Sequence, residues 1–150
     1  MSLVRIILGS KSDLSIGEDI KSMLDQFKVP YDFHISSAHR KPEQTMKLAQ
    51  SAQSDGIKVI IAVAGMAAHL PGVVASHTTL PVIGVPVKGA TLAGEDALYA
   101  IVQMPTGIPV ATVAINGGKN AAILACQILG TSMPKYSQLL QEYKEELANA

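Results

Sequence analysis

The sequence has no tryptophan and few other aromatic residues, with four tyrosines and two phenylalanines among 150 residues. It also lacks a charge excess, because twelve lysines and arginines balance twelve aspartates and glutamates. Proteins that collect nucleic acid or anionic lipid normally carry a broad positive field. We therefore expect neither a nucleic acid nor a membrane as a partner.

Cysteine and long hydrophobic runs are scarce as well. The single cysteine, Cys126, lies in an apolar run and has no partner for an internal disulfide. We expect a small buried hydrophobe there rather than a nucleophile, and a reducing, cytoplasmic location. No apolar run reaches membrane-spanning length, and residues 1–8 are too short for a signal peptide. Hydrophobic residues make up 48% of the chain, enough for the core of one domain over residues 1–150.

Strand-like and helix-like patterns alternate along the chain without a break in composition. Runs typical of strands occupy residues 4–8, 31–36, 58–63, 81–85 and 109–115. Patterns typical of helices occupy residues 14–27, 42–54, 70–76, 94–103, 119–129 and 136–147. Because βα units join parallel strands by right-handed crossovers, we predict a three-layer α/β fold. It has a Rossmann-like parallel sheet, flanking helices and a C-terminal helix.

Polar or glycine-containing loops follow the first three predicted strands, at residues 9–13, 37–40 and 64–69. Ligands of open parallel sheets bind outside the carboxyl ends of the strands, so the three loops are expected to converge on one pocket. The second loop combines the hydroxyl of Ser37, the imidazole of His39 and the guanidinium of Arg40. Histidine is the side chain that ordinarily titrates near neutral pH, and a guanidinium can form two parallel hydrogen bonds to a phosphate. This combination predicts an active site for a phosphorylated metabolite.

Each of these residues also has a purely structural interpretation. Ser12 or Asp13 suits the N-cap of the first helix as well as a ribose contact. His39 also fits the surface at the start of a helix, and His69 fits a helix start or the core. The small residues 64–68 suit tight packing as well as a planar ligand against the main chain. A zinc site from the two histidines would lack cysteine and a carboxylate-rich shell, so we assume no metal.

Five segments, taken in order, resemble the 5-(carboxyamino)imidazole ribonucleotide mutase family of purine biosynthesis. They are residues 9–13, 37–42, 64–72, 80–87 and 101–110, and the match extends over nearly the whole chain. The resemblance implies a flavodoxin-like domain, a homo-octamer, and a small ribonucleotide substrate. The implied reaction converts 5-carboxyamino-1-(5-phospho-D-ribosyl)imidazole into 5-amino-1-(5-phospho-D-ribosyl)imidazole-4-carboxylate. It uses no ATP, metal or organic cofactor.

The resemblance also implies roles for individual residues, with His39 as the acid/base. The ribose phosphate portion is assigned to Ser10, Asp13 and Arg40, with Ser37 assisting at the phosphate. The imidazole and carboxylate end is assigned to Ser12, Ala64, Gly65, His69 and Leu70. The chain departs from the usual family residues at Lys41, Met66, Ala97 and Ala100.

Three alternatives remain open. The third loop fits the mutase branch, and a related carboxylase that uses free carbon dioxide is the main competitor. The other two are a flavin-binding module, which would usually have aromatic residues covering the flavin, and a receiver module, which would have clustered acidic residues after the first strand.

Two predicted helix surfaces suggest contact between subunits. One is formed by Ala121, Ala122 and Ala125, and the other by Leu139, Leu140, Tyr143 and Leu147.

Overall fold

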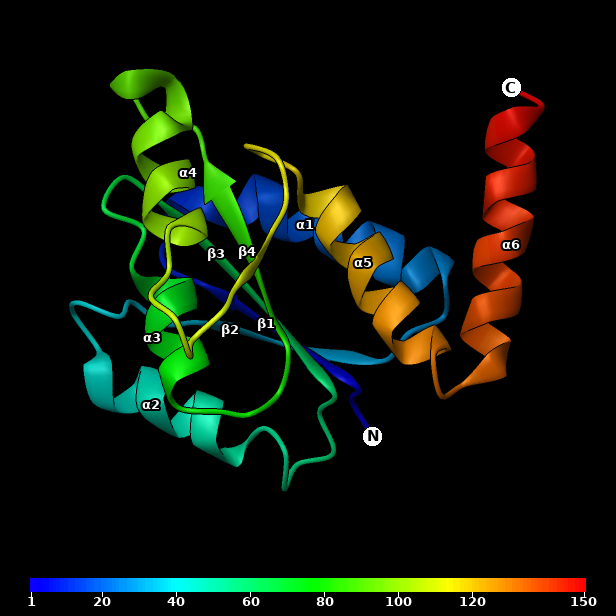
Figure 1. The fold of residues 1–150 in the computed structure, drawn as a ribbon, viewed down its shortest axis with the longest axis horizontal. Coiled ribbons are helices and arrows are strands. Elements are labelled where there is room, and N and C mark those ends of the chain that lie inside the picture. Colours follow the sequence, from blue (N-terminus) through cyan, green and yellow to red (C-terminus); the bar gives the residue numbers. More distant parts are fainter.

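A five-stranded parallel sheet organises the chain, and the computed structural model describes residues 1–150 (Figure 1). The strand order is β2-β1-β3-β4-β5, as in flavodoxin-like folds. The strands are β1 (Val4–Leu8), β2 (Tyr31–Ile35), β3 (Val59–Gly65), β4 (Val82–Val87) and β5 (Ala111–Thr112). The α/β class and the parallel sheet predicted from the alternating pattern are therefore confirmed.

The chain has six α-helices and two short 3-10 turns, and the last two helices follow the final strand. The helices are α1 (Leu14–Gln26), α2 (Pro42–Ser51), α3 (Leu70–Ser76), α4 (Glu95–Val102), α5 (Gly118–Gly130) and α6 (Pro134–Ala148). The 3-10 turns are η1 (Lys11–Asp13) and η2 (Leu92–Gly94), which the sequence patterns did not predict. Proline occupies the first turn of α2, α3 and α6, where its missing N–H costs no helical hydrogen bond. None of the helices combines the length and apolar character needed to cross a membrane.

Two hydrophobic cores cover the two faces of the sheet. Alternate strand residues such as Ile6 and Ile61 face α1 and α5, whereas their neighbours Ile7 and Ile60 belong to the core beneath α2, α3 and α4. Figure 1 shows α1 and α5 on one side of the sheet and α2, α3 and α4 on the other. The central strands β1 and β3 are buried on both faces, which explains their mostly apolar sequences. The exception is Arg5 in β1, which is buried and forms an ion pair with Asp32.

The last strand is much shorter than predicted. We expected a strand over residues 109–115, but only Ala111 and Thr112 pair with β4. The backbone of Pro86 faces β5, because its carbonyl accepts a hydrogen bond from the N–H of Asn116 at 2.8 Å. Since proline has no N–H to donate in return, the ladder ends there.

The prediction that the alanines of α5 form a surface for subunit contact is wrong. Ala121, Ala122 and Ala125 are fully buried in the core of their own chain. Close packing of α5 on α1 explains this, because a Cβ on Gly118 would lie 2.9 Å from the carbonyl oxygen of Ile16. Cys126 on the same helix is also fully buried. Burial raises the pKa of its thiol to about 11, so the thiol stays protonated and unreactive at neutral pH.

The apolar stripe of α6 is largely covered by the same chain. This helix stands at the edge of the molecule beyond α5 (Figure 1). Leu140 is buried, and the ring of Tyr143 packs edge-on against Phe27 with centroids 5.3 Å apart. Only Leu147 at the far end of the stripe is well exposed, at 58%. The stripe therefore acts mainly as core, with one residue left for contact elsewhere.

Candidate active site

A cleft of about 500 Å³ lies at the carboxyl ends of β1, β2 and β3, where the loops that follow these strands meet. This is the place that the parallel sheet predicts for a ligand. The lining includes all ten residues expected at the site, namely Ser10, Ser12, Asp13, Ser37, His39, Arg40, Ala64, Gly65, His69 and Leu70. Ala38, Met66 and Ala67 add mostly small or apolar surface to the same cleft.

The loop after β1 presents two hydroxyls and a buried carboxylate. Ser10 caps the turn η1. The Oγ of Ser10 accepts one hydrogen bond from the backbone N–H of Ser12 at 3.2 Å and another from the Oγ of Ser12 at 3.0 Å. Asp13 occupies the N-cap position of α1 but makes no side-chain cap hydrogen bond. Asp13 thus has the N-cap position predicted for Ser12 or Asp13 but does not cap α1 with its side chain, and the side-chain cap belongs to Ser10 in the preceding turn η1.

Asp13 is only 5% exposed although it lines the cleft. Burial raises the pKa of its carboxyl group above the ordinary 3.8, and a backbone hydrogen bond at Ser10 acts in the opposite direction. A buried carboxylate that does not cap its helix is a suitable acceptor for ligand hydroxyls. The arrangement can therefore receive a sugar.

The loop after β2 is held in shape by hydroxyl groups. The Oγ of Ser37 accepts a hydrogen bond from the N–H of Arg40 at 3.1 Å. Beneath the loop, the fully buried hydroxyls of Ser36 and Thr45 lie 2.7 Å apart. Thr45 also donates to the carbonyl of Lys41 at 3.0 Å. Thr45 therefore ties α2 to the loop that carries His39 and Arg40.

The loop after β3 contains an unusual backbone conformation. Met66 has a φ of 53°, in the left-handed region that glycine adopts without strain. Its side chain is 65% exposed beside the cleft. His69 follows at the N-cap position of α3 and is exposed, so the core position considered for it is wrong. The left-handed backbone conformation of Met66 thus carries a conformational cost.

His39 and His69 are in direct contact. Nε2 of His39 lies 2.8 Å from Nδ1 of His69, and the two rings meet edge to face with centroids 4.9 Å apart. A hydrogen bond between two imidazole nitrogens requires one N–H and one lone pair. While it persists, the pair can bind only one proton beyond its neutral form. The two histidines thus form a single proton-handling unit at the centre of the cleft.

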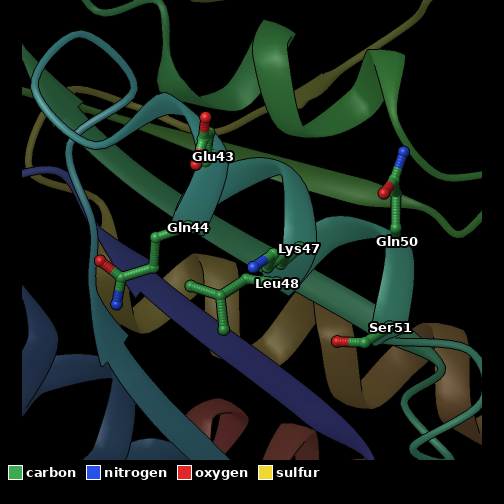
Figure 2. Close-up of a pocket in the computed structure, with 6 residues that line it drawn as sticks. All are labelled: Glu43, Gln44, Lys47, Leu48, Gln50 and Ser51. Carbon is green, nitrogen blue, oxygen red and sulfur yellow. The ribbon is translucent and has the colours of Figure 1, made fainter.

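Other features of the surface lack this convergence. A groove runs along α2, lined by residues of that helix alone: Glu43, Gln44, Lys47, Leu48, Gln50 and Ser51 (Figure 2). A polar hollow at the opposite ends of the strands is lined by His77, Thr78 and residues around Gly107. No group of three or more histidine, cysteine, aspartate or glutamate side chains has an arrangement suited to a metal ion.

Several functional features were missed from the sequence. The contact between the two histidines joins loops that follow different strands, and no local pattern reports it. The hydroxyl pair of Ser36 and Thr45 was also missed, although a serine at a strand end followed by a threonine within the next helix was a usable signal.

Comparison with known proteins gives consistent relationships. A family model described as AIR carboxylase matches residues 3–150. The N5-carboxyaminoimidazole ribonucleotide mutase of Thermotoga maritima is 54% identical over 147 residues, which cover 98% of this chain and 86% of that protein. The phosphoribosylaminoimidazole carboxylase of Schizosaccharomyces pombe is 56% identical over 145 residues, or 97% of this chain.

Coverage differs between these relatives. The chain spans 26% of the length of the Schizosaccharomyces pombe protein, so it corresponds to one part of that larger polypeptide. Among solved structures, Treponema denticola PurE matches with a TM-score of 0.91 and 32% sequence identity. That match covers 99% of this chain and 93% of the other.

Proposed function

The chain belongs to the AIR carboxylase family, and we propose that it catalyses the N5-carboxyaminoimidazole ribonucleotide mutase reaction of purine biosynthesis. In this isomerisation a carboxylate moves from the exocyclic nitrogen of the imidazole to ring carbon 4, without ATP. The observation that carries the proposal is the convergence of a histidine pair, a buried carboxylate and an arginine in one cleft. The mutase relatives, of which the chain spans most of the length, support the same reaction.

The proposed chemistry needs one proton carrier and a closed place for carbon dioxide. His39 donates a proton to the nitrogen as the N–C bond breaks and carbon dioxide leaves. Carbon 4 then attacks the retained carbon dioxide, and His39 removes the proton from carbon 4. The two proton transfers cancel, so one residue that gives up a proton and takes one back suffices. The contact with His69 orients the ring that performs both transfers.

Binding is assigned to the rest of the cleft. Arg40 and Ser37 hold the phosphate, and Asp13 with Ser10 holds the ribose. Ser12, Ala64, Gly65, His69 and Leu70 surround the imidazole and its carboxylate. Remote phosphate binding of this kind fixes the position of the reacting carbon and so lowers the barrier. We assign no cofactor and no metal to the reaction.

The competing function is carboxylation of the aminoimidazole ribonucleotide by free carbon dioxide, which the name of the Schizosaccharomyces pombe relative suggests. An ATP-free assay separates the two. We expect the purified protein to convert the carboxyamino ribonucleotide directly to the 4-carboxylate. Failure with this substrate, together with turnover of aminoimidazole ribonucleotide and bicarbonate, would assign the carboxylase activity instead.

We also propose that residues 1–150 act as one mutase domain, that the chain forms a homo-octamer, and that it works in the cytoplasm. One sheet with a core on each face supports the single domain. Exposed apolar side chains support assembly, namely Met66 beside the cleft, Leu92 in η2 and Tyr99 on α4. A lone buried cysteine suits a reducing compartment.

A further inference from the structure

A second hollow, of about 310 Å³, opens beside the cleft. The two share Gly9, Ser10, Ser37 and Arg40 in their walls, so they form neighbouring compartments of one larger site. The second compartment has three lining residues of its own, which are Lys11, Ile35 and Lys41. The loops after β1 and β2 supply nearly all of its wall.

The charge of this compartment is strongly one-sided. Its wall contains Lys11, Arg40 and Lys41 and no acidic residue. The ion pairs of the chain involve Arg5, Lys21 and His34, and none involves these three cations. Because positive and negative residues balance over the whole chain, three uncompensated cations around one hollow are a local departure from neutrality.

The same wall offers the other donors that a phosphate needs. Ser10, Ser37 and Arg40 all line the compartment, so two hydroxyl-bearing residues and one guanidinium-bearing residue border it. A guanidinium binds phosphate oxygens through a planar fork, whereas lysine acts as a mobile point charge. Three cations exceed what a carboxylate or a neutral sugar requires, and they match a phosphate monoester that carries nearly two negative charges.

We propose that Lys11 and Lys41 are specificity residues for the phosphate group of the substrate, completing a compartment whose anchor is Arg40. This inference rests on the proposed function only for the identity of the ribonucleotide. Both lysines are exposed, so they attract the phosphate through solvent and contribute to capture rather than to the chemical step. They therefore act on substrate affinity and on its salt dependence and leave turnover unchanged.

Ligand binding tests the proposal without requiring any catalysis. Calorimetry at low ionic strength would measure the affinity for ribose 5-phosphate and for inorganic phosphate, with ribose as the uncharged comparison. We expect Lys11→Gln and Lys41→Gln each to weaken ribose 5-phosphate binding by about three- to tenfold, and the double variant by more. Lys41→Arg is expected to retain most of the affinity. Lys47→Gln, which removes an exposed charge from the separate groove on α2, is the matched control with no effect.

Steady-state kinetics with the carboxyamino ribonucleotide supply the second readout. The double variant is expected to raise KM by tenfold or more at low salt with kcat within twofold of the parent, and the difference is expected to shrink as salt rises. Unchanged ribose 5-phosphate affinity in the double variant overturns the proposal, as does a parent protein that binds ribose 5-phosphate no better than ribose. Lysine-dependent phosphate binding in a protein without mutase activity would sustain this inference and refute only the proposed reaction.

Discussion

The side chain of His39 derives its proposed role from its neighbour. Its Nε2 faces Nδ1 of His69 at 2.8 Å, so the tautomer of one ring fixes the tautomer of the other. A single exposed imidazole rotates freely, and a paired one is held. We therefore treat the two histidines as one device in which His39 carries the proton and His69 positions it.

Substitution of the two histidines is expected to give unequal losses. His39→Asn keeps a polar group of similar size but cannot carry a proton, so kcat is expected to fall by about two to four orders of magnitude while substrate still binds. In His69→Asn the amide can replace Nδ1 as a hydrogen-bond partner, so we expect a loss of about tenfold or less. His69→Ala removes the partner and is expected to lose about a hundredfold. Near-normal turnover of a folded His39→Asn variant would reject the acid/base assignment and transfer that role to His69.

The carboxyl group of Asp13 is expected to favour ribose binding while lowering the stability of the fold. Its pKa in the folded chain is raised by burial, so the native state binds this proton more tightly than the unfolded state does. The free energy of unfolding therefore decreases as pH rises from the ordinary value of 3.8 through the raised pKa. Ionisation of this buried carboxyl group therefore destabilises the fold.

Asp13→Asn is thus expected to increase the free energy of unfolding at neutral pH and to flatten its dependence on pH between 3.8 and neutrality. The same change is expected to raise the KM of the ribonucleotide by about tenfold, since an amide accepts fewer hydrogen bonds than a carboxylate. Urea unfolding at several pH values and steady-state kinetics measure the two effects. Glu142→Gln, at an exposed position on α6, is the control. A destabilised Asp13→Asn would show that the carboxylate serves the fold instead.

At the scale of elements, the shape of the loop after β2 depends on α2, the helix that follows it. Thr45 is among the few buried residues of α2, and its hydroxyl bonds Ser36 and the carbonyl of Lys41. This connection holds His39 and Arg40 over the cleft. The rigidity of the site is therefore expected to depend on a residue that never contacts the substrate.

Thr45→Val tests this connection because the two side chains have nearly the same shape. The change leaves the Ser36 hydroxyl buried without its partner, which is expected to lower the free energy of unfolding by about 1–3 kcal/mol. We also expect a lower kcat/KM through the loosened loop. Adding Ser36→Ala removes the orphaned hydroxyl and is expected to recover part of the stability but not the activity. Additive losses in the double variant would contradict the coupling.

The elements differ in how far the sequence predicts them. Strands β1 and β3 were predictable because burial on both faces favours mostly apolar sequences, with Arg5 as the one charged residue in β1. The length of β5 could not be predicted from its own sequence, because it depends on Pro86 in the neighbouring strand. The site loops were predictable because parallel strands place their carboxyl ends together, whereas the contact of His39 with His69 depends on how two loops fold in space.

For the whole molecule, the strand order places the cleft. The chain passes from β1 through α1 on one face to β2, and then through α2 on the other face to β3. Because β1 lies between β2 and β3, the three site loops emerge side by side where the helices diverge. The fold thus delivers hydroxyls, histidines and arginine to one place from distant parts of the sequence.

Assembly is the second property at this scale. Met66 and Leu92 are 65% and 68% exposed, and a Cβ on Gly89 would lie 3.6 Å from Cγ of Met66, so the loop after β4 borders the cleft. Light scattering at micromolar concentration is expected to give the mass of a closed oligomer, and Leu92→Glu is expected to shift it to smaller species. A monomeric mass for the parent protein would contradict the proposed octamer.

In the proposed reaction, carbon dioxide moves from nitrogen to carbon inside the cleft without escaping. The small residues of the third loop, including Ala64, Gly65 and Ala67, give that intermediate a confined neutral wall. The direct test supplies substrate with an isotopically labelled carboxylate in unlabelled bicarbonate and measures the label in the product. We predict that most of the label is retained at carbon 4. Extensive dilution by bicarbonate would contradict the mutase mechanism and favour carboxylation by free carbon dioxide.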